Sequence, residues 1–120
     1  MNPPHAIAAS IIVPHFDQCE MLARCLESLE AQSVARSDYE IIVADNDTPG
    51  GISQIVRKFP NVIFLTETTR GAAAARNAAM ARARGDVLAF TDADCIAAPD
   101  WLARGMEALD QTEMAGGAVN

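Results

Sequence analysis

Short, continuously apolar segments alternate with segments of helical spacing along the whole chain, and this order limits the possible folds more than any other feature. Apolar runs predict buried strands at residues 6–13, 39–44, 61–65 and 86–91, with a fifth beginning at 115–119. Apolar residues at spacings of three and four predict helices at 17–29, 52–59, 71–84 and 99–109. Strands that are apolar on both faces are typical of a parallel sheet with helices on both sides. We predict an α/β fold of this kind, in one domain over residues 1–120.

Charge and cysteine content exclude several classes of protein. Sixteen acidic against nine basic residues give a net charge of −7, which argues against a general nucleic-acid or anionic-membrane binder. The three cysteines are odd in number and lack metal-ligand spacing, so we interpret them as reduced cytosolic thiols. No apolar run approaches the ~18 residues of a membrane span, and the N-terminus does not resemble a secretory signal. We expect a cytoplasmic location.

Two aspartates, Asp92 and Asp94, follow the strand predicted at 86–91. Side chains alternate along an extended chain, so residues two apart can face the same way. Facing carboxylates repel each other unless a cation lies between them, and their hard oxygens suit Mg²⁺ or Mn²⁺. A solvated acidic turn is the alternative, and the tripeptide by itself fits both.

Other polar residues follow the first two predicted strands, where ligands of parallel sheets usually bind. His15 follows the first strand, although a histidine there is more often an ordinary loop residue. Asp45 and Asn46 follow the second and offer the acceptors and amide donors that a base-reading pocket needs, although both are also turn formers. Arg76 lies among alanines that let a helix approach the sheet, and it could contact base or phosphate oxygens. No glycine-rich phosphate loop is present, so phosphate binding would depend on the metal.

In order and spacing, the chain resembles the nucleotide-sugar half of family 2 glycosyltransferases of the GT-A fold, over SIIVPHFDQ, EIIVADNDTPGG, RGAAAARNAAMARARGDVLAFTDADC and PDWL. The resemblance runs from about residue 8 to residue 120. It implies a Rossmann-like nucleotide-binding half and a nucleoside diphosphate sugar as donor. It further implies an inverting, metal-dependent transfer of the sugar to an acceptor hydroxyl.

Carried over residue by residue, the resemblance implies a role for each matching position. Pro14, His15 and Phe16 would line the nucleotide pocket, and Asp45 or Asn46 would contact the base. Arg76 would lie near the nucleotide and Asp92 near the ribose. Asp94, together with Asp92, would bind Mg²⁺ or Mn²⁺. The chain departs from the commoner family pattern at His15, Phe16, Asp17 and Asn46–Asp47. The last departure resembles members that use UDP- or dTDP-linked sugars.

Family members continue beyond this length, so the resemblance implies that the general base and the acceptor site lie outside residues 1–120. We therefore expect no sugar transfer by this chain alone. We also expect an open edge on the fourth strand that favours self-association, unless the segment 115–119 rearranges to cover that edge. In a longer protein, peripheral association with the inner membrane face stays open. A non-catalytic nucleotide-binding fragment is the first alternative. A receiver-like phosphoacceptor domain is remote, because it needs a lysine after the fifth strand and the only lysine is Lys58.

Overall fold

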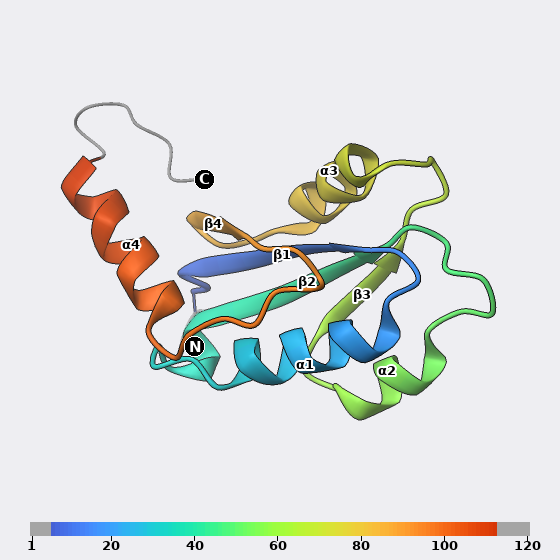
Figure 1. Ribbon diagram of the computed structural model, residues 1–120. Helices are drawn as coiled ribbons and strands as arrows, with labels where there is room; N and C mark the ends of the chain where they lie inside the picture. The colour runs from blue at the N-terminus through green and yellow to red at the C-terminus, as the bar shows by residue number, and fades with distance from the viewer. Residues whose placement is uncertain (1–5, 113–120) are drawn as a thin grey trace, which may run out of the picture.

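The computed structural model describes residues 6–112, which form a parallel four-stranded sheet in the order β3-β2-β1-β4 (Figure 1). The strands are β1 (Ala9–His15), β2 (Tyr39–Asp45), β3 (Ile63–Thr66) and β4 (Val87–Phe90). The helices are α1 (Cys19–Glu30), the short 3₁₀ helix η1 (Arg36–Asp38), α2 (Ser53–Lys58), α3 (Ala72–Arg82) and α4 (Trp101–Thr112). The predicted α/β class and parallel sheet are confirmed. The fifth strand predicted at 115–119 lies outside the described residues.

Both faces of the two central strands are buried, which explains their continuous apolar sequences. Ile11, Val13 and Ile41 belong to a core with α1, α2 and α4. Residues that alternate with them, such as Ile12 and Ile42, pack on the other face against α3. Figure 1 shows α3 on one side of the sheet and α1 and α2 on the other.

The strand order reverses between β1 and β4, so these two strands form the topological switch point of the sheet. β2 and β3 follow β1 on one side, and β4 returns to pair with the other side of β1. A crevice outside the carboxyl ends of strands at such a point is where α/β sheets bind ligands. The order also differs from the 2-1-3-4-5 order of receiver-like folds, so the phosphoacceptor alternative is set aside.

Pro14 does not end β1, contrary to the prediction that the strand stops before it. β1 runs on to His15 and pairs with β2 as far as Asp45. Pairing with β4 has already ended at Ile12 and Phe90, and the Thr91 N–H donates to the Ile12 carbonyl at 3.2 Å. By the two-residue period of a strand, the Pro14 nitrogen faces that same side, where no amide donor is needed. The gap beside Pro14 opens the crevice.

Gly85 was predicted to stop the third helix, but α3 ends at Arg82. Gly85 instead lies against the backbone of β1, where a β-carbon would come within 2.5 Å of the Ala9 carbonyl carbon. This close approach lets the chain enter β4 directly beside β1. Among the described residues, no helix is long and apolar enough to cross a membrane.

Candidate functional site

A polar pocket of about 250 Å³ opens at the carboxyl ends of β1 and β4. Its walls come from the loops after β1, β2 and β4 and from the first turn of α3, and the lining residues are Pro14, His15, Phe16, Gln18, Asn46, Ala72, Ala75, Asp92, Ala93 and Asp94. Six residues that we predicted for the site are therefore brought together. Asp45 and Arg76 do not line this pocket.

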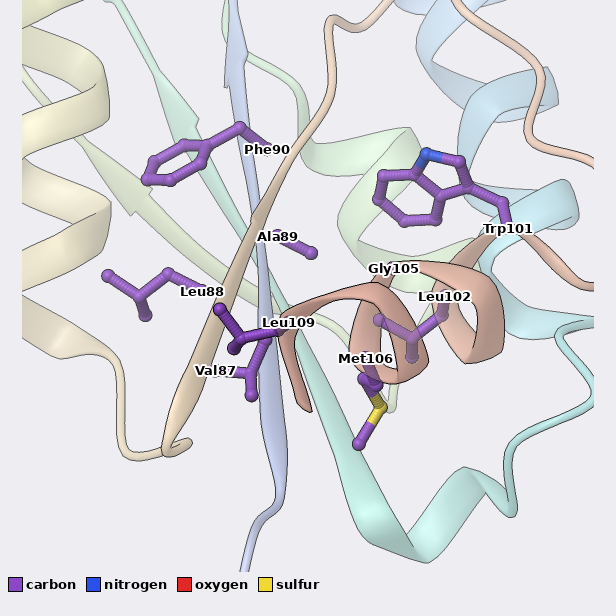
Figure 2. Close-up of a pocket in the computed structure, with 9 residues that line it drawn as sticks. All are labelled: Val87, Leu88, Ala89, Phe90, Trp101, Leu102, Gly105, Met106 and Leu109. Carbon is purple, nitrogen blue, oxygen red and sulfur yellow. The ribbon is translucent and has the colours of Figure 1, made fainter. Parts of the chain in front are cut away.

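A second, smaller pocket of about 90 Å³ lies between β4 and α4 (Figure 2). It is lined by Val87, Leu88, Ala89, Phe90, Trp101, Leu102, Gly105, Met106 and Leu109. None of these side chains can ionise, and only the Trp101 indole can donate a hydrogen bond. The pocket between β4 and α4 therefore offers no group for acid–base or metal chemistry.

Asp92 and Asp94 converge, but through a turn rather than through an extended strand. β4 ends at Phe90, and the Cys95 N–H donates to the Asp92 carbonyl at 3.1 Å. One ligand atom from each of Asp92, Asp94 and Cys95 lies within 4.8 Å of the others, and all three residues are exposed. The two carboxylates lie close together, as predicted. The prediction that they do so because side chains alternate along a strand is wrong, since both residues follow the end of β4.

The donor atoms of this turn fit a hard divalent cation. Both carboxylates are solvent-accessible, and their oxygens, which lie within 4.8 Å of each other, are the ligand type that Mg²⁺ or Mn²⁺ takes. The nearby Cys25 thiol does not compete for the ion. Burial, together with the charges of Cys95, Asp94 and Asp92, raises the pKa of Cys25 to about 12, so it stays protonated at neutral pH.

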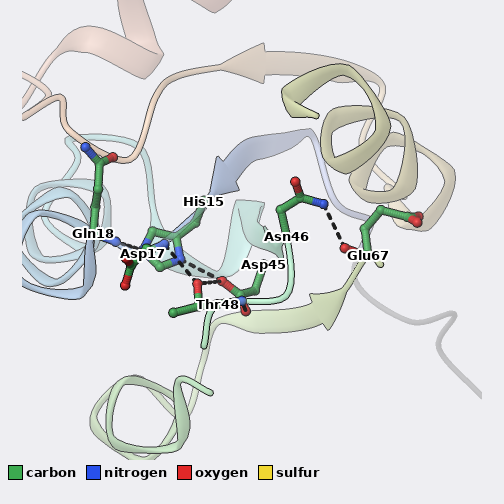
Figure 3. Close-up of polar contacts among 7 residues, drawn as sticks. All are labelled: His15, Asp17, Gln18, Asp45, Asn46, Thr48 and Glu67. Carbon is green, nitrogen blue, oxygen red and sulfur yellow. Dashed lines mark hydrogen bonds and ion pairs between the residues drawn. The ribbon is translucent and has the colours of Figure 1, made fainter. Parts of the chain in front are cut away.

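A buried hydrogen-bonded cluster joins the loop after β1 to the loop after β2 (Figure 3). His15 Nδ1 lies 2.8 Å from Asp45 Oδ1, and the Thr48 hydroxyl donates to the same oxygen at 2.6 Å. The Thr48 N–H donates to Asp45 Oδ2 at 3.0 Å. The N–H groups of Asp17 and Gln18 donate to Thr48 Oγ1 and His15 Nε2, each at 2.9 Å. The His15–Asp45 and Asp17–Thr48 bonds thus join the two loops, and the other bonds fix each loop internally.

Asn46 holds a different loop, on the side of α3. Its amide nitrogen donates to the carbonyls of Glu67 and Thr69, both at 2.8 Å, and its Oδ1 accepts the Gly71 N–H at 2.9 Å. Gly71 has a φ of 120°, which favours glycine, and it directly precedes α3. Asn46 lines the pocket, and its Oδ1 keeps one acceptor lone pair. This is the only capacity that its side chain has left for a ligand.

Arg70 is the arginine that contacts the pocket wall, and sequence reasoning missed it. Its guanidinium carbon lies 5.9 Å from the centroid of the Phe16 ring, and Phe16 is 42% exposed. Arg76 is half-buried on α3, outside the lining. Gln18 and Thr48 were also missed as site residues. The turn-forming sequence after Asp45 is a signal that could have found Thr48, because aspartate side chains in turns bind groups a few residues further on, as Asp45 binds Thr48 here.

The model of Glycosyl transferase family 2 matches residues 10–119, and the chain belongs to that family. It is similar to Glycosyltransferase AglE of Haloferax volcanii, at 32% identity over 92% of this chain and 38% of that protein. It is also similar to the Bacillus subtilis glycosyltransferase YfnE, at 36% identity over 88% of this chain and 28% of that protein. The chain spans well under half the length of these curated relatives.

Solved structures of glycosyltransferases share the fold. Staphylococcus aureus TarS 1–349, solved with UDP, matches with a TM-score of 0.79 and 25% identity over 89% of this chain and 33% of that chain. The mannosyltransferase PcManGT of Pyrobaculum calidifontis, solved with GDP-Man and Mn²⁺, matches with a TM-score of 0.77 and 28% identity over 88% of this chain and 33% of that chain. The Rossmann-like GT-A fold is thereby shown.

Proposed function

We propose that this chain is the donor-binding part of an inverting, metal-dependent glycosyltransferase that moves a sugar from a nucleoside diphosphate sugar to an acceptor hydroxyl. The observation that carries the proposal is the polar pocket at the switch point, with Asp92 and Asp94 at its rim. Family membership supports the transferase class. TarS has been solved with UDP and PcManGT with GDP-Man and Mn²⁺, which supports a nucleotide ligand and a divalent metal.

The proposed roles follow the walls of the pocket. Pro14, His15 and Phe16 form the wall nearest β1, and Phe16 offers an exposed ring face to a base. Between Asp45 and Asn46 we choose Asn46 for the base, because Asn46 lines the pocket and has an acceptor lone pair left. Such an acceptor suits a ring N–H, which uracil and thymine carry and guanine also carries. UDP- or dTDP-linked sugars remain our preferred donors.

The acidic turn is proposed as the metal and ribose site. Asp92 would contact the ribose and share the ion with Asp94, and Mg²⁺ or Mn²⁺ would neutralise charge on the diphosphate leaving group. Arg76 remains a proposed nucleotide contact that a side-chain movement would have to bring to the pocket. We also propose that the 120-residue chain binds donor without transferring its sugar. A cytoplasmic location remains a proposal as well.

The decisive experiment is calorimetric titration with UDP, dTDP and GDP in Mn²⁺ and in chelator. We expect binding of UDP or dTDP in Mn²⁺ only. Asp94→Asn should weaken that binding about tenfold or more, because it removes a charged metal ligand from an exposed turn. Asp86→Asn is the matched control, since this exposed aspartate precedes the amino end of β4. Equal binding in chelator and Mn²⁺ would refute the metal site, and no binding at all would refute the function.

A further inference from the structure

The carboxylate of Asp45 does not line the pocket. It accepts three hydrogen bonds instead, two from Thr48 and one from His15. The side chains of His15 and Asp45 are 0% and 4% exposed. We propose that His15 is a positioning residue: its ring joins Asp45 to the start of α1 and so holds Phe16 and Gln18 at the wall of the nucleotide pocket. The inference rests on the proposed function for the ligand, while the loop geometry stands independently of it.

The hydrogen-bond partners of the ring fix its tautomer. A backbone N–H can only donate, and the Gln18 N–H lies 2.9 Å from His15 Nε2, so Nε2 presents its lone pair. The ring proton therefore resides on Nδ1 and is donated to Asp45 at 2.8 Å. Both ring nitrogens are used, and the imidazole is neutral. A ring held at both ends in this way cannot turn without losing a bond.

The two bonds of the ring bracket the segment that reaches the pocket. Phe16 and Asp17 lie between His15 and Gln18, and Asp17 has a left-handed backbone with a φ of 52°. Glycine adopts that conformation most readily, and aspartate tolerates it better than most other residues. It is held by the bond from the Asp17 N–H to the Thr48 hydroxyl. Without the His15 ring the segment keeps this bond, the bond from the Asn46 N–H to the carbonyl of residue 15, and the contact of Arg70 with Phe16. It loses both ring bonds, so Phe16 is held less firmly at the pocket wall.

The same cluster determines which neighbour at the end of β2 faces the ligand. Asp45 and His15 are register partners in adjacent strands, so their side chains lie on the same face of the sheet. On that face His15 and Thr48 satisfy the carboxylate. Asn46 is thereby left as the residue after β2 that borders the pocket. His15 consequently influences base recognition through Asp45 without touching the base through its own ring nitrogens.

Nitrogen NMR of the imidazole tests the tautomer directly. We expect His15 to show a protonated Nδ1 and an unprotonated Nε2 at neutral pH, with a coupling or contact between Nδ1–H and Asp45. The opposite tautomer, or rapid averaging of the two, would overturn the proposal, because either requires the Gln18 bond to be absent.

Variants of His15 test the consequence for binding. His15→Phe keeps a flat ring and removes both bonds, so we expect about a fivefold to tenfold loss of UDP or dTDP affinity in Mn²⁺. His15→Asn offers an amide donor near the position of Nδ1 and should recover part of that loss. Ser10→Ala is the control, because it breaks buried bonds at the opposite end of the sheet. It should lower the melting temperature and leave the affinity unchanged.

Two outcomes would contradict a positioning role. One is wild-type affinity in His15→Phe, and the other is an equal loss of affinity in Ser10→Ala. Hydrogen exchange separates this proposal from the proposed function: His15→Phe should speed exchange of the Asp17 and Gln18 amides more than Ser10→Ala does. If the wild-type chain binds no nucleotide, the proposed function is refuted. The positioning role of His15 is then tested by hydrogen exchange alone. Unchanged exchange at both amides would overturn it.

Discussion

Asp45 and Asn46 are adjacent at the end of β2, yet they stabilise opposite sides of the site. Asp45 binds His15 and Thr48 on the face that α1 covers, whereas Asn46 binds the loop before α3. Consecutive strand residues point to opposite faces, which accounts for the division. Together the two side chains fix the loops after β1 and β2 and the loop that leads into α3.

The cysteines provide a residue-scale prediction. Alkylation by iodoacetamide at pH 8 should modify Cys95 first, because it is exposed, and Cys25 last, because burial and nearby acidic groups raise its pKa to about 12. Only the thiolate attacks the reagent. Burial and the charges of Asp45 and Asp17 also raise the pKa of Cys19, so it should react at an intermediate rate.

Peptide mass spectrometry at timed intervals measures this order. In urea the three cysteines should react at similar rates, since the burial that separates them is lost. Reaction of Cys25 as fast as Cys95 in the folded protein would contradict the packing of α1 against the acidic turn.

Strands and helices could be predicted where the pattern of apolar residues within the segment itself determines them. The four strands follow from continuous apolar runs, and their positions hold within a few residues, although only β1 and β2 are fully buried. The end of β1 could not be predicted from the sequence. The strand tolerates Pro14 because its pairing with β4 stops two residues earlier, at Ile12. The role of Gly85 likewise depends on a strand that is distant in sequence. The choice between Asp45 and Asn46 stayed open because it depends on which sheet face borders the pocket.

A network at the amino ends of β1 and β2 supports an element-scale prediction. Glu40 accepts the Ser10 hydroxyl at 2.6 Å, the Arg84 N–H at 2.7 Å and the Arg84 guanidinium at 3.0 Å. Burial by itself would raise the pKa of Glu40. The hydrogen bonds and the Arg84 charge outweigh burial and lower the pKa below its ordinary 4.5. The stabilisation is therefore complete above pH 4.5 and is lost as the pH falls through the lowered value.

Glu40→Gln should lower the free energy of unfolding by about 2 kcal/mol at pH 7, because charge-assisted bonds are replaced by weaker ones. The difference from wild type should shrink on acidification below pH 4.5. Urea unfolding between pH 3 and pH 7 measures both effects. Glu20→Gln, at an exposed glutamate of α1, is the control and should change stability little at any pH. A constant difference across the range would contradict the pKa direction.

At the scale of the molecule, the sheet order places the site and leaves one strand at an edge. β4 returns beside β1, which brings the acidic turn to the loops after β1 and β2. No sequence pattern within one element encodes that order, so the polar residues could be assigned to one end of the sheet but not to one pocket. Within residues 6–112, no strand pairs with the outer edge of β4.

That edge underlies the prediction that the chain self-associates. The N–H groups of Val87 and Thr91 donate to β1, so by the two-residue period the N–H and C=O groups of Leu88 and Phe90 face outward. Unpaired groups on an apolar strand favour pairing with a second copy of the chain. Beside them lies the apolar pocket under α4 (Figure 2). We expect the weight-average mass in sedimentation equilibrium to rise with concentration.

Leu88→Pro tests the edge itself, because it removes an outward N–H while leaving the donors to β1 in place. We expect the variant to stay monomeric where wild type associates. Leu88→Ala is the matched control: it removes the same side chain but keeps the amide, so its association should resemble that of wild type if backbone pairing is responsible. Equal loss of association in both variants would assign it to the apolar side chains instead. A wild-type chain that is monomeric at high concentration, with β4 uncovered, would refute self-association through this edge.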